Sequence, residues 1–417
     1  MKVEEVISKI EHLPKLHEKN DLSYIKKVLA YLGNPQDKVK TIHVTGTNGK
    51  GSTSYYIANL LKKAGKRTGL FVSPYISKFN ERIQINLDLI SDKDLIKAYQ
   101  VVTRVINKIK ETDDTFSLVT FEFETVMAFW LFAEKHCDYA VIEVGIGGQH
   151  DKTNVITPEV SVITSIGLDH EDIIGPTIED IAKEKSGIIK KGRPVVFGEI
   201  AAKPLNILIN QAKQMRVRYF EYEKDYQIII DKKIKFTNSQ YQLSFNLRSP
   251  VEAIDMGIAV EVITILGLQL KPQAVEQAIN ETVIPGRYQI ISRHPEIILD
   301  GAHNIQAISN LVGFVREQPH HKLYYLMGMM KDKDLDQVFT QFRFDEEIVL
   351  TRIDYPRAAE FEDFPEFIRN RSQFIENYQA AFDRVKEQLG ENDILIVTGS
   401  FYLVGAILNY WEKKDES

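Results

Sequence analysis

The stretch "HVTGTNGKGSTSYY" (residues 43–56) brings glycines, one lysine and several hydroxyl side chains together in the manner of a phosphate-binding loop. Backbone N–H groups in such a loop, together with the first turn of the following helix, attract anions. Lys50 would neutralise phosphate charge, and Ser52 or Thr53 would offer a hydroxyl group to Mg²⁺ or to a phosphate. The spacing departs from the common G-x-x-x-x-G-K-[ST] pattern, because Val44 stands at the first glycine position and Gly51 follows the lysine. The simpler alternative is a tight strand-to-helix turn.

A second group of polar residues follows apolar runs further along the chain. Glu143 interrupts the apolar strand pattern "YAVIEVGIGG", where a carboxylate needs an ion-pair partner or a metal ion. Asp169 and His170 are expected at the end of the next strand, and Ser73 at the end of "GLFVSP". A carboxylate, a hydroxyl and an imidazole suit Mg²⁺ beside phosphate oxygens. We therefore expect metal ligands at Ser73, Glu143 and His170, with a buried ion pair as the alternative for Glu143.

The later part of the chain carries another set of candidates. Arg287 lies in "PGRYQ", whereas Asp300 and His303 lie in "DGAHN", directly after an apolar run. An arginine and an aspartate near a domain junction can clamp a nucleotide when the domains close. An interdomain salt bridge is the alternative. Lys185 belongs to the lysine-rich stretch "IAKEKSGIIKKG", and the residues alone favour a solvated helix face for it.

Short apolar runs alternate with helical patterns over most of the chain, which is typical of α/β proteins with a parallel sheet and crossover helices. In such sheets ligands bind at the carboxyl ends of the strands, where these candidates lie. Residues 219–248 instead alternate in polarity and contain turn residues, so we expect antiparallel hairpins there. The strand-helix alternation restarts after the prolines and glycine around 285–295, and we place the domains at 1–290 and 291–417.

The composition narrows the classes of function. A net charge of −6 over 417 residues argues against a nucleic-acid binder that relies on phosphate neutralisation. The single cysteine, Cys137, excludes an internal disulfide and fits a reducing compartment. The N-terminal stretch lacks the apolar core of a signal peptide, and no apolar run reaches the roughly 18 residues of a membrane span. We expect a cytoplasmic protein that binds neither nucleic acid nor membrane.

Several motifs occur in an order that resembles folylpolyglutamate synthases, the folate-directed members of the Mur ligase family. They are "HVTGTNGKGS", "SPYISKFNERI", "VIEVGIGGQHDKTN", "SIGLDHEDIIGPTIEDIAKEKSGIIK", "PGR", "DGAHN" and "TGSFYL", and the spelling of the first loop is this family's own. The resemblance covers nearly the whole chain. It implies a central P-loop-type ATPase domain, a smaller Rossmann-like C-terminal domain that carries the glutamate-ligase part, and a need for ATP and Mg²⁺.

The resemblance also implies roles for individual residues. The ATP-binding positions would be Asn48, Gly49, Lys50, Gly51, Ser52, Asp255, Arg287 and Asp300. The Mg²⁺ ligands would be Ser73, Glu143 and His170. The residues near the incoming glutamate would be His303 and Ser400. Lys185 corresponds to a lysine that is carbamylated in the family, and the catalytic residues would be Lys50, Lys185 and His303.

The implied reaction is the ATP-dependent joining of L-glutamate to the γ-carboxylate of a folate by a monomeric enzyme. The γ-phosphoryl group would convert the carboxylate into an acyl phosphate, which the amine of glutamate then attacks. Dihydropteroate as the acceptor is one alternative, although "DLSYIKK" (21–27) differs from the Gly-Leu-x-Arg-like stretch of members that make dihydrofolate. A non-catalytic folate- or nucleotide-binding protein is another. Its motivation is that Glu252 and Asp255 stand where the family has a glutamine and an asparagine.

Overall fold

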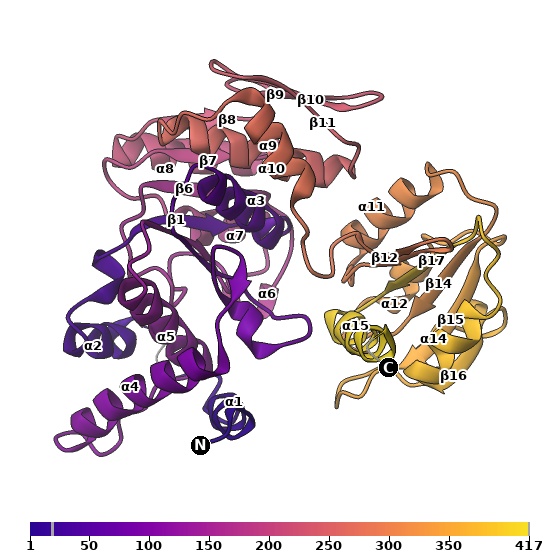
Figure 1. Ribbon diagram of the computed structural model, residues 1–417, viewed down its shortest axis with the longest axis horizontal. Coiled ribbons are helices and arrows are strands. Elements are labelled where there is room, and N and C mark those ends of the chain that lie inside the picture. The colour runs from indigo at the N-terminus through magenta and orange to yellow at the C-terminus, as the bar shows by residue number, and fades with distance from the viewer. Residues whose placement is uncertain (18–20, 416–417) are drawn as a thin grey trace. The chain divides into compact units, whose positions relative to one another are not determined.

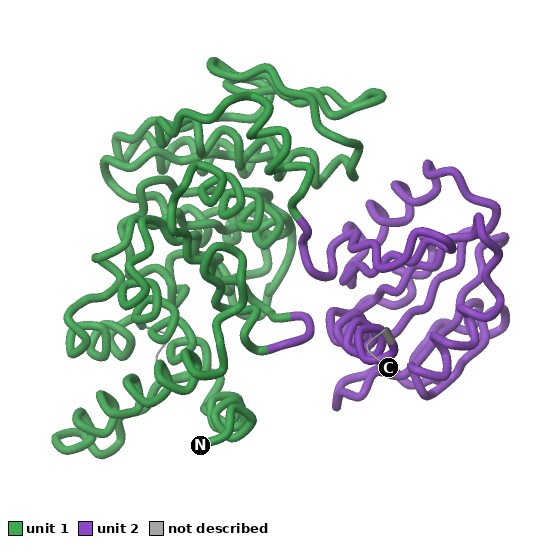
Figure 2. The backbone as a smooth tube through the Cα atoms, in the orientation of Figure 1, with its two compact units in different colours: residues 1–75, 79–282 green, residues 76–78, 283–417 purple. Residues whose placement is uncertain are grey.

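The computed structural model describes residues 1–17 and 21–415. The chain divides into two compact units, which Figure 2 distinguishes by colour. Unit 1 comprises Met1–Tyr75 and Phe79–Thr282, and unit 2 comprises Ile76–Lys78 and Val283–Ser417. The main part of unit 2 therefore begins at Val283, a few residues before the domain boundary expected at 290/291. Within the described ranges, no helix is long and apolar enough to cross a membrane.

Unit 1 is built on an eight-stranded sheet with the order β4-β3-β2-β5-β1-β6-β7-β8. Its strands are β1 (Lys40–Thr45), β2 (Thr68–Phe71), β3 (Ile83–Ile85), β4 (Asp88–Leu89), β5 (Tyr139–Glu143), β6 (Val160–Ile163), β7 (Val195–Phe197) and β8 (Tyr219–Glu221). The neighbouring strands from β2 to β8 in this order pair in parallel, and the pairs β2–β3 and β3–β4 are antiparallel. The expected mostly parallel sheet is confirmed.

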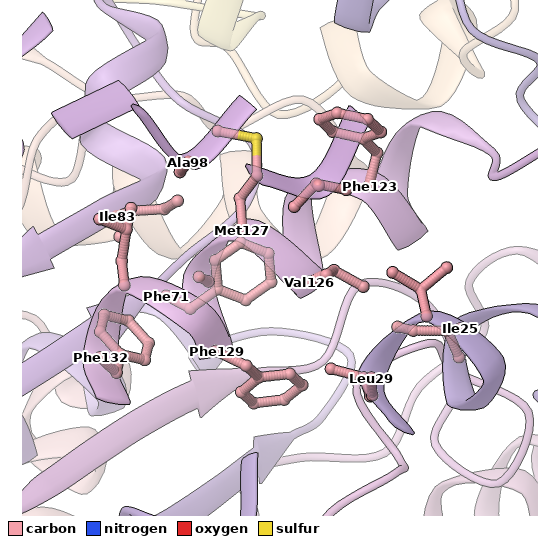
Figure 3. Packing of buried hydrophobic residues seen from close by; sticks show 14 of the residues in the cluster. Ile25, Leu29, Phe71, Ile83, Ala98, Phe123, Val126, Met127, Phe129 and Phe132 are labelled. Atoms are coloured by element: carbon pink, nitrogen blue, oxygen red, sulfur yellow. The ribbon is translucent and has the colours of Figure 1, made fainter. Parts of the chain in front are cut away.

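Helices cover both faces of this sheet (Figure 1). They are α1 (Val3–Glu11), α2 (Ser23–Tyr31), α3 (Lys50–Lys63), α4 (Asp92–Lys110), α5 (Thr120–Glu134), α6 (Glu171–Ile174), α7 (Ile178–Ser186), α8 (Ala202–Met215), α9 (Pro250–Ile265) and α10 (Pro272–Glu281). Short 3₁₀ turns occur at Pro35–Asp37 and Phe79–Arg82. Helix α5 is apolar nearly all round, as expected for a helix buried between neighbours. Figure 3 shows its side chains Phe123, Phe129 and Phe132 in the core with Phe71 of β2.

Alternation along β5 decides which side chains meet which helices, because successive residues of a strand point to opposite faces. Ala140 and Ile142 pack in the core that contains α5. Glu143 therefore projects to the other face, which α3 covers. Helix α3 lies beside α9 and α10 (Figure 1), and Asn59 of α3 donates a hydrogen bond of 2.8 Å to the carbonyl oxygen of Ala278 in α10.

The hairpins expected within residues 219–248 are confirmed as a separate antiparallel sheet. It contains β9 (Gln227–Ile230), β10 (Ile234–Thr237) and β11 (Gln242–Phe245), with β10 in the middle. Phe236 and Phe245 turn toward the interior and are buried, whereas the alternate positions Lys235 and Thr237 are exposed. This period of two is the pattern that distinguished the segment in the sequence.

Unit 2 is a second α/β layer structure, with a six-stranded sheet of order β12-β13-β17-β14-β15-β16. Its strands are β12 (Gln289–Arg293), β13 (Glu296–Leu299), β14 (Leu323–Met327), β15 (Glu347–Arg352), β16 (Gln373–Asn377) and β17 (Ile394–Thr398). All pairs are parallel except β12 with β13. Its helices are α11 (Ile305–Arg316), α12 (Leu335–Phe339), α13 (Glu366–Arg369), α14 (Tyr378–Lys386) and α15 (Phe401–Asp415), with a 3₁₀ turn at Phe361–Asp363. Separate apolar clusters fill the two faces of the sheet.

Candidate active site

The glycine loop expected to bind phosphate connects β1 to α3. Gly49 caps the N-terminus of α3 with a φ of 83°, which favours glycine because other residues rarely adopt this conformation. The first N–H groups of α3 have no partner within the helix, and the helix dipole adds positive potential at this end. The loop therefore has the geometry of an anion-binding site.

Two lysine side chains converge on this loop from different helices. Lys50 Nζ, at the start of α3, lies 3.0 Å from the carbonyl oxygen of Gly46 and 3.2 Å from that of Thr47. Lys185 Nζ, from the last turn of α7, lies 2.9 Å from the same Gly46 oxygen. Lys185 is only 3% exposed, so the solvated helix face that the residues alone favoured is wrong for it, whereas Lys183 is exposed.

Burial changes the protonation of Lys185. The pKa of its amine is lowered from 10.5 to about 7, first by removal from water and then by the nearby charge of Lys50. The carboxylates of Asp169, Asp151 and Glu184 oppose this shift. An amine with such a pKa is partly neutral at physiological pH and can act as a nucleophile.

Glu184 fixes the helix turn that carries Lys185, a role that the sequence did not reveal. One oxygen of its carboxylate accepts hydrogen bonds from the backbone N–H of His150 at 2.9 Å and of Gly148 at 3.3 Å. The other lies 2.8 Å from Nδ1 of His150. A Cβ atom at Gly148 would lie 2.9 Å from the Cα of Lys185, so the glycine permits this close packing. The turn after β5 and the end of α7 are thus joined directly.

Glu143 and Ser73 lie together next to the first turn of α3. Glu143 ends β5 and is buried, and its Oε2 accepts a hydrogen bond of 2.9 Å from the backbone N–H of Ser73. A Cβ atom added to Gly51 would lie 3.6 Å from Glu143 Oε1, so the carboxylate lies beside the first turn of α3. The parallel pairing of β2 with β5 brings these two strand ends to one edge. Two of the three expected metal ligands are therefore neighbours.

His170 lies elsewhere in the local structure than expected. Strand β6 ends at Ile163, and Asp169 and His170 follow an irregular segment, so the expectation that they end the strand is wrong. His170 adopts a left-handed backbone (φ 51°) at the N-terminus of α6, and its side chain is 45% exposed. Its Nε2 lies 3.7 Å from Asp169 Oδ2. The described residues contain no cluster of three His, Cys, Asp or Glu side chains that could hold a metal ion.

Glu252 and Asp255 of α9, which the resemblance sets against a glutamine and an asparagine, face α3. Asp255 Oδ1 accepts a hydrogen bond of 3.0 Å from Thr53 Oγ1, and a Cβ atom at Gly49 would collide with the Asp255 carboxylate. Glu252 Oε1 accepts one of 2.6 Å from the hydroxyl of Tyr56. Both carboxylates are buried. Asp255 thus places a carboxylate beside the phosphate-binding loop itself.

Unit 2 carries its own group of expected site residues at the ends of β13 and β17. Asp300 is buried, and its carboxylate accepts hydrogen bonds from the backbone N–H of Tyr288 at 3.0 Å and of Ala302 at 2.8 Å. Burial raises the pKa of Asp300, and the charge of Arg287 opposes this rise. Asp300 therefore organises the backbone around Arg287.

Phe401 joins this group and was not identified from the sequence. The guanidinium carbon of Arg287 lies 4.5 Å from the centre of its ring, and the ring of His303 lies 5.7 Å from it. His303 Nδ1 donates a hydrogen bond of 2.8 Å to the carbonyl oxygen of Gly301. Ser400, directly before Phe401, is buried and accepts a hydrogen bond from the Tyr402 N–H. The structure brings Arg287, Asp300, His303 and Ser400 to one edge of the unit 2 sheet.

Comparisons with known proteins identify the family of the chain. The Mur ligase middle domain matches residues 44–263, and the Mur ligase glutamate ligase domain matches residues 286–401. The chain is 33% identical to folylpolyglutamate synthase of Lacticaseibacillus casei over 98% of both chains. It is 30% identical to dihydrofolate synthase/folylpolyglutamate synthase of Bacillus subtilis, covering 93% of this chain and 94% of that protein.

Solved structures extend the likeness to three dimensions. A structure described as an FPGS-AMPPCP-folate complex superposes with a TM-score of 0.86 and 30% identity, covering 99% of this chain and all of that one. The matches to both Mur ligase domains and the similarity to relatives over nearly the whole chain support assignment to the same family. The chain belongs to the Mur ligase family.

Proposed function

We propose that this protein is an ATP-dependent ligase that joins L-glutamate to the γ-carboxylate of a folate and releases ADP and phosphate. The observation that carries the proposal is the convergence of Lys50 and Lys185 on the Gly46 carbonyl, with Glu143 beside Gly51. The names of the relatives and the folate and AMPPCP in a similar structure support the choice of substrates.

The chemistry requires activation of the acceptor, because a carboxylate is a poor electrophile. Lys50 and the N–H groups at the start of α3 hold the phosphates and stabilise the charge that develops during γ-phosphoryl transfer. Transfer forms a bond between phosphorus and a carboxylate oxygen and breaks the bond to the β-phosphate. The glutamate amine then attacks the acyl carbon, phosphate leaves, and a proton is lost from the nitrogen.

The donor set fits a Mg²⁺ ion bound with the nucleotide. Glu143 and Ser73 are adjacent, whereas His170 follows β6, which is separated from β5 by β1 in the sheet. These residues would hold the ion with help from phosphate oxygens and water, since the described residues form no all-protein cluster. When bound, the ion would neutralise negative charge on the transferring phosphoryl group.

Lys185 is suited to carbamylation. After the ammonium group loses a proton, its neutral amine would attack CO₂, forming a nitrogen–carbon bond and losing a second proton. The two steps together replace a buried cation by an anion. That change would remove the repulsion between Lys185 and Lys50 that lowers the pKa of Lys185. A carbamate beside the loop would provide a further oxygen ligand for Mg²⁺.

Unit 2 supplies the remaining groups in this proposal. Arg287 and Asp300 bind the nucleotide, and His303 and Ser400 bind the incoming glutamate. The support is that Arg287 and His303 lie against Phe401, and that Asp300 and Ser400 follow the neighbouring strands β13 and β17 at one edge of the sheet, where ligands of α/β proteins bind. The protein acts as a monomer in the cytoplasm. Burial raises the pKa of the Cys137 thiol to about 11, so this cysteine stays unreactive there.

The test is an acceptor assay with ATP, Mg²⁺ and glutamate. A tetrahydrofolate should give ADP and a folate longer by one glutamate. Turnover with dihydropteroate as well would assign the second activity, dihydrofolate synthesis. Release of ADP without any acceptor would contradict the proposal. The absence of ADP release with every folate tested, over a range of pH, would contradict it as well.

A non-catalytic nucleotide-binding protein is the second candidate, and the Asp255 carboxylate beside Gly49 is the observation that favours it. Tight binding of ATP without ADP release in the same assay would support it. The variant Asp255→Asn separates the two candidates further. If the carboxylate alone suppresses turnover, this variant should gain ligase activity that the wild-type protein lacks.

A further inference from the structure

Three hydroxyl side chains fasten the loop after β6 to the phosphate-binding loop. We call Thr47, Thr164 and Ser165 the hydroxyl clasp. Ser165 Oγ lies 2.9 Å from the backbone nitrogen of Asn48 and 3.0 Å from its carbonyl oxygen. Thr164 Oγ1 donates to the same carbonyl oxygen at 2.5 Å. The backbone N–H of Thr47 also donates to the Ser165 carbonyl oxygen at 3.0 Å.

In the second half of the clasp, the hydroxyl group belongs to the phosphate-binding loop and the backbone groups belong to the loop after β6. Thr47 Oγ1 donates to the carbonyl oxygen of Gly167 at 3.0 Å and accepts from the Gly167 N–H at 2.9 Å. Each hydroxyl group has one proton and two lone pairs, so Thr47 and Ser165 can each donate and accept as observed. Each loop thus contributes a hydroxyl that bridges both backbone groups of a single residue in the other loop.

The clasp lies in the chain just before two side chains of the candidate site, Asp169 and His170. Residues 164–170 belong to no helix or strand, so no regular hydrogen-bond ladder sets their path. Asp169 contributes to the electrostatic surroundings of Lys185, and His170 begins α6. The clasp therefore joins the phosphate-binding loop by hydrogen bonds to the segment that leads into these two residues.

We propose that Thr47 and Ser165 are positioning residues that couple occupancy of the phosphate-binding loop to the position of Asp169 and His170. A nucleotide that orders residues 46–49 will then also order residues 165–170. The inference rests on the proposed function, since it takes a nucleotide as the ligand of the loop. Neither hydroxyl needs to touch the reacting atoms, because each acts through the backbone that it holds.

Hydrogen exchange measured with ADP as the probe tests the coupling. In the nucleotide-free protein, Thr47→Val should speed exchange of the Gly167 amide by about 2- to 10-fold, the effect expected for loss of one hydrogen bond. In the wild-type protein, ADP should slow exchange over residues 166–172. This protection should be lost in Ser165→Ala and Thr47→Val and retained in Thr47→Ser, which keeps the hydroxyl group.

The matched control is Ser161→Ala. Ser161 is a buried serine of β6 whose hydroxyl donates to the Ile188 carbonyl oxygen at 2.8 Å and takes no part in the clasp. This variant should retain the ADP-dependent protection, which separates the clasp from a general loss of packing. Thr47→Val provides a second route if Ser165→Ala fails to fold.

The outcomes distinguish this inference from the proposed function. Calorimetry that detects no ADP binding to the wild-type protein would overturn both. ADP binding without protection of residues 166–172 would overturn the coupling alone. Protection that persists in both Ser165→Ala and Thr47→Val, or that disappears equally in Ser161→Ala, would also reject it. Under the proposal, the clasp variants should lower kcat more than they raise KM for ATP, because the loop itself remains.

Discussion

Exposure of the protein to ¹³C-labelled bicarbonate should produce a carbamate carbon resonance that depends on Lys185. Only a neutral amine attacks CO₂. An amine at the ordinary pKa of 10.5 is neutral in roughly one molecule in 3,000 at pH 7, whereas at a pKa of about 7 it is neutral in about half. Burial beside Lys50 therefore raises the reactive fraction about 1,500-fold over that of an exposed lysine.

The pH dependence follows from the same shift. Deprotonation favours the neutral form as pH rises through the folded-state pKa. At constant dissolved CO₂ the neutral fraction of Lys185 should rise from about one-tenth at pH 6 to about nine-tenths at pH 8, with a midpoint near 7. Lys50→Met removes the neighbouring cation that lowers this pKa, so the midpoint should move to higher pH.

Lys185→Arg is the matched control, because arginine keeps the positive charge but stays protonated. It should abolish the resonance. Lys185→Ala should keep ATP binding but lose turnover, and short carboxylates added to the assay should restore part of it. The reasoning is refuted if the wild-type protein gives no resonance, if the resonance persists in Lys185→Arg, or if its midpoint lies near 10.

Three further variants test the site and the scaffold. Asp255→Asn removes a charge beside the phosphate-binding loop and should strengthen ATP binding by about 1 kcal/mol, roughly fivefold in Kd by calorimetry; unchanged or weaker binding would contradict this. Glu143→Gln can still accept the Ser73 hydrogen bond but loses the negative charge. The rate of ADP release should therefore fall on the order of 10²-fold with little change in the melting temperature. Turnover near that of the wild-type protein would show that Glu143 is not part of the site. Glu346→Gln weakens a two-point ion pair with Arg316 (2.6 and 2.8 Å) and should cost about 1–3 kcal/mol in denaturant unfolding. The exposed control Glu376→Gln should cost less than about 0.5 kcal/mol, and equal losses would refute the distinction.

The architecture of both units could be read from local patterns. Short apolar runs between helical patterns predicted the parallel sheet with crossover helices, and the alternation of Phe236 and Phe245 with polar neighbours predicted the hairpins. The loop around Lys50 was visible because glycines and hydroxyls are rarely combined with a lysine for any other purpose. Such features depend on residues that are close in sequence, which is why the sequence alone sufficed.

The state of the site was decided only by tertiary contacts. Lys185 looked solvated among its lysine neighbours, yet α7 packs it against the carbonyl of Gly46 and lowers the pKa of its amine. His170 looked like the end of a strand, yet the chain leaves β6 earlier and presents its ring at the start of α6. Charge, solvation and the facing of side chains such as Asp255 depend on which distant segments pack together. Residue types and spacing determine what groups the protein has, and the packing of the parallel sheet and its helices determines which of them meet and in what protonation state.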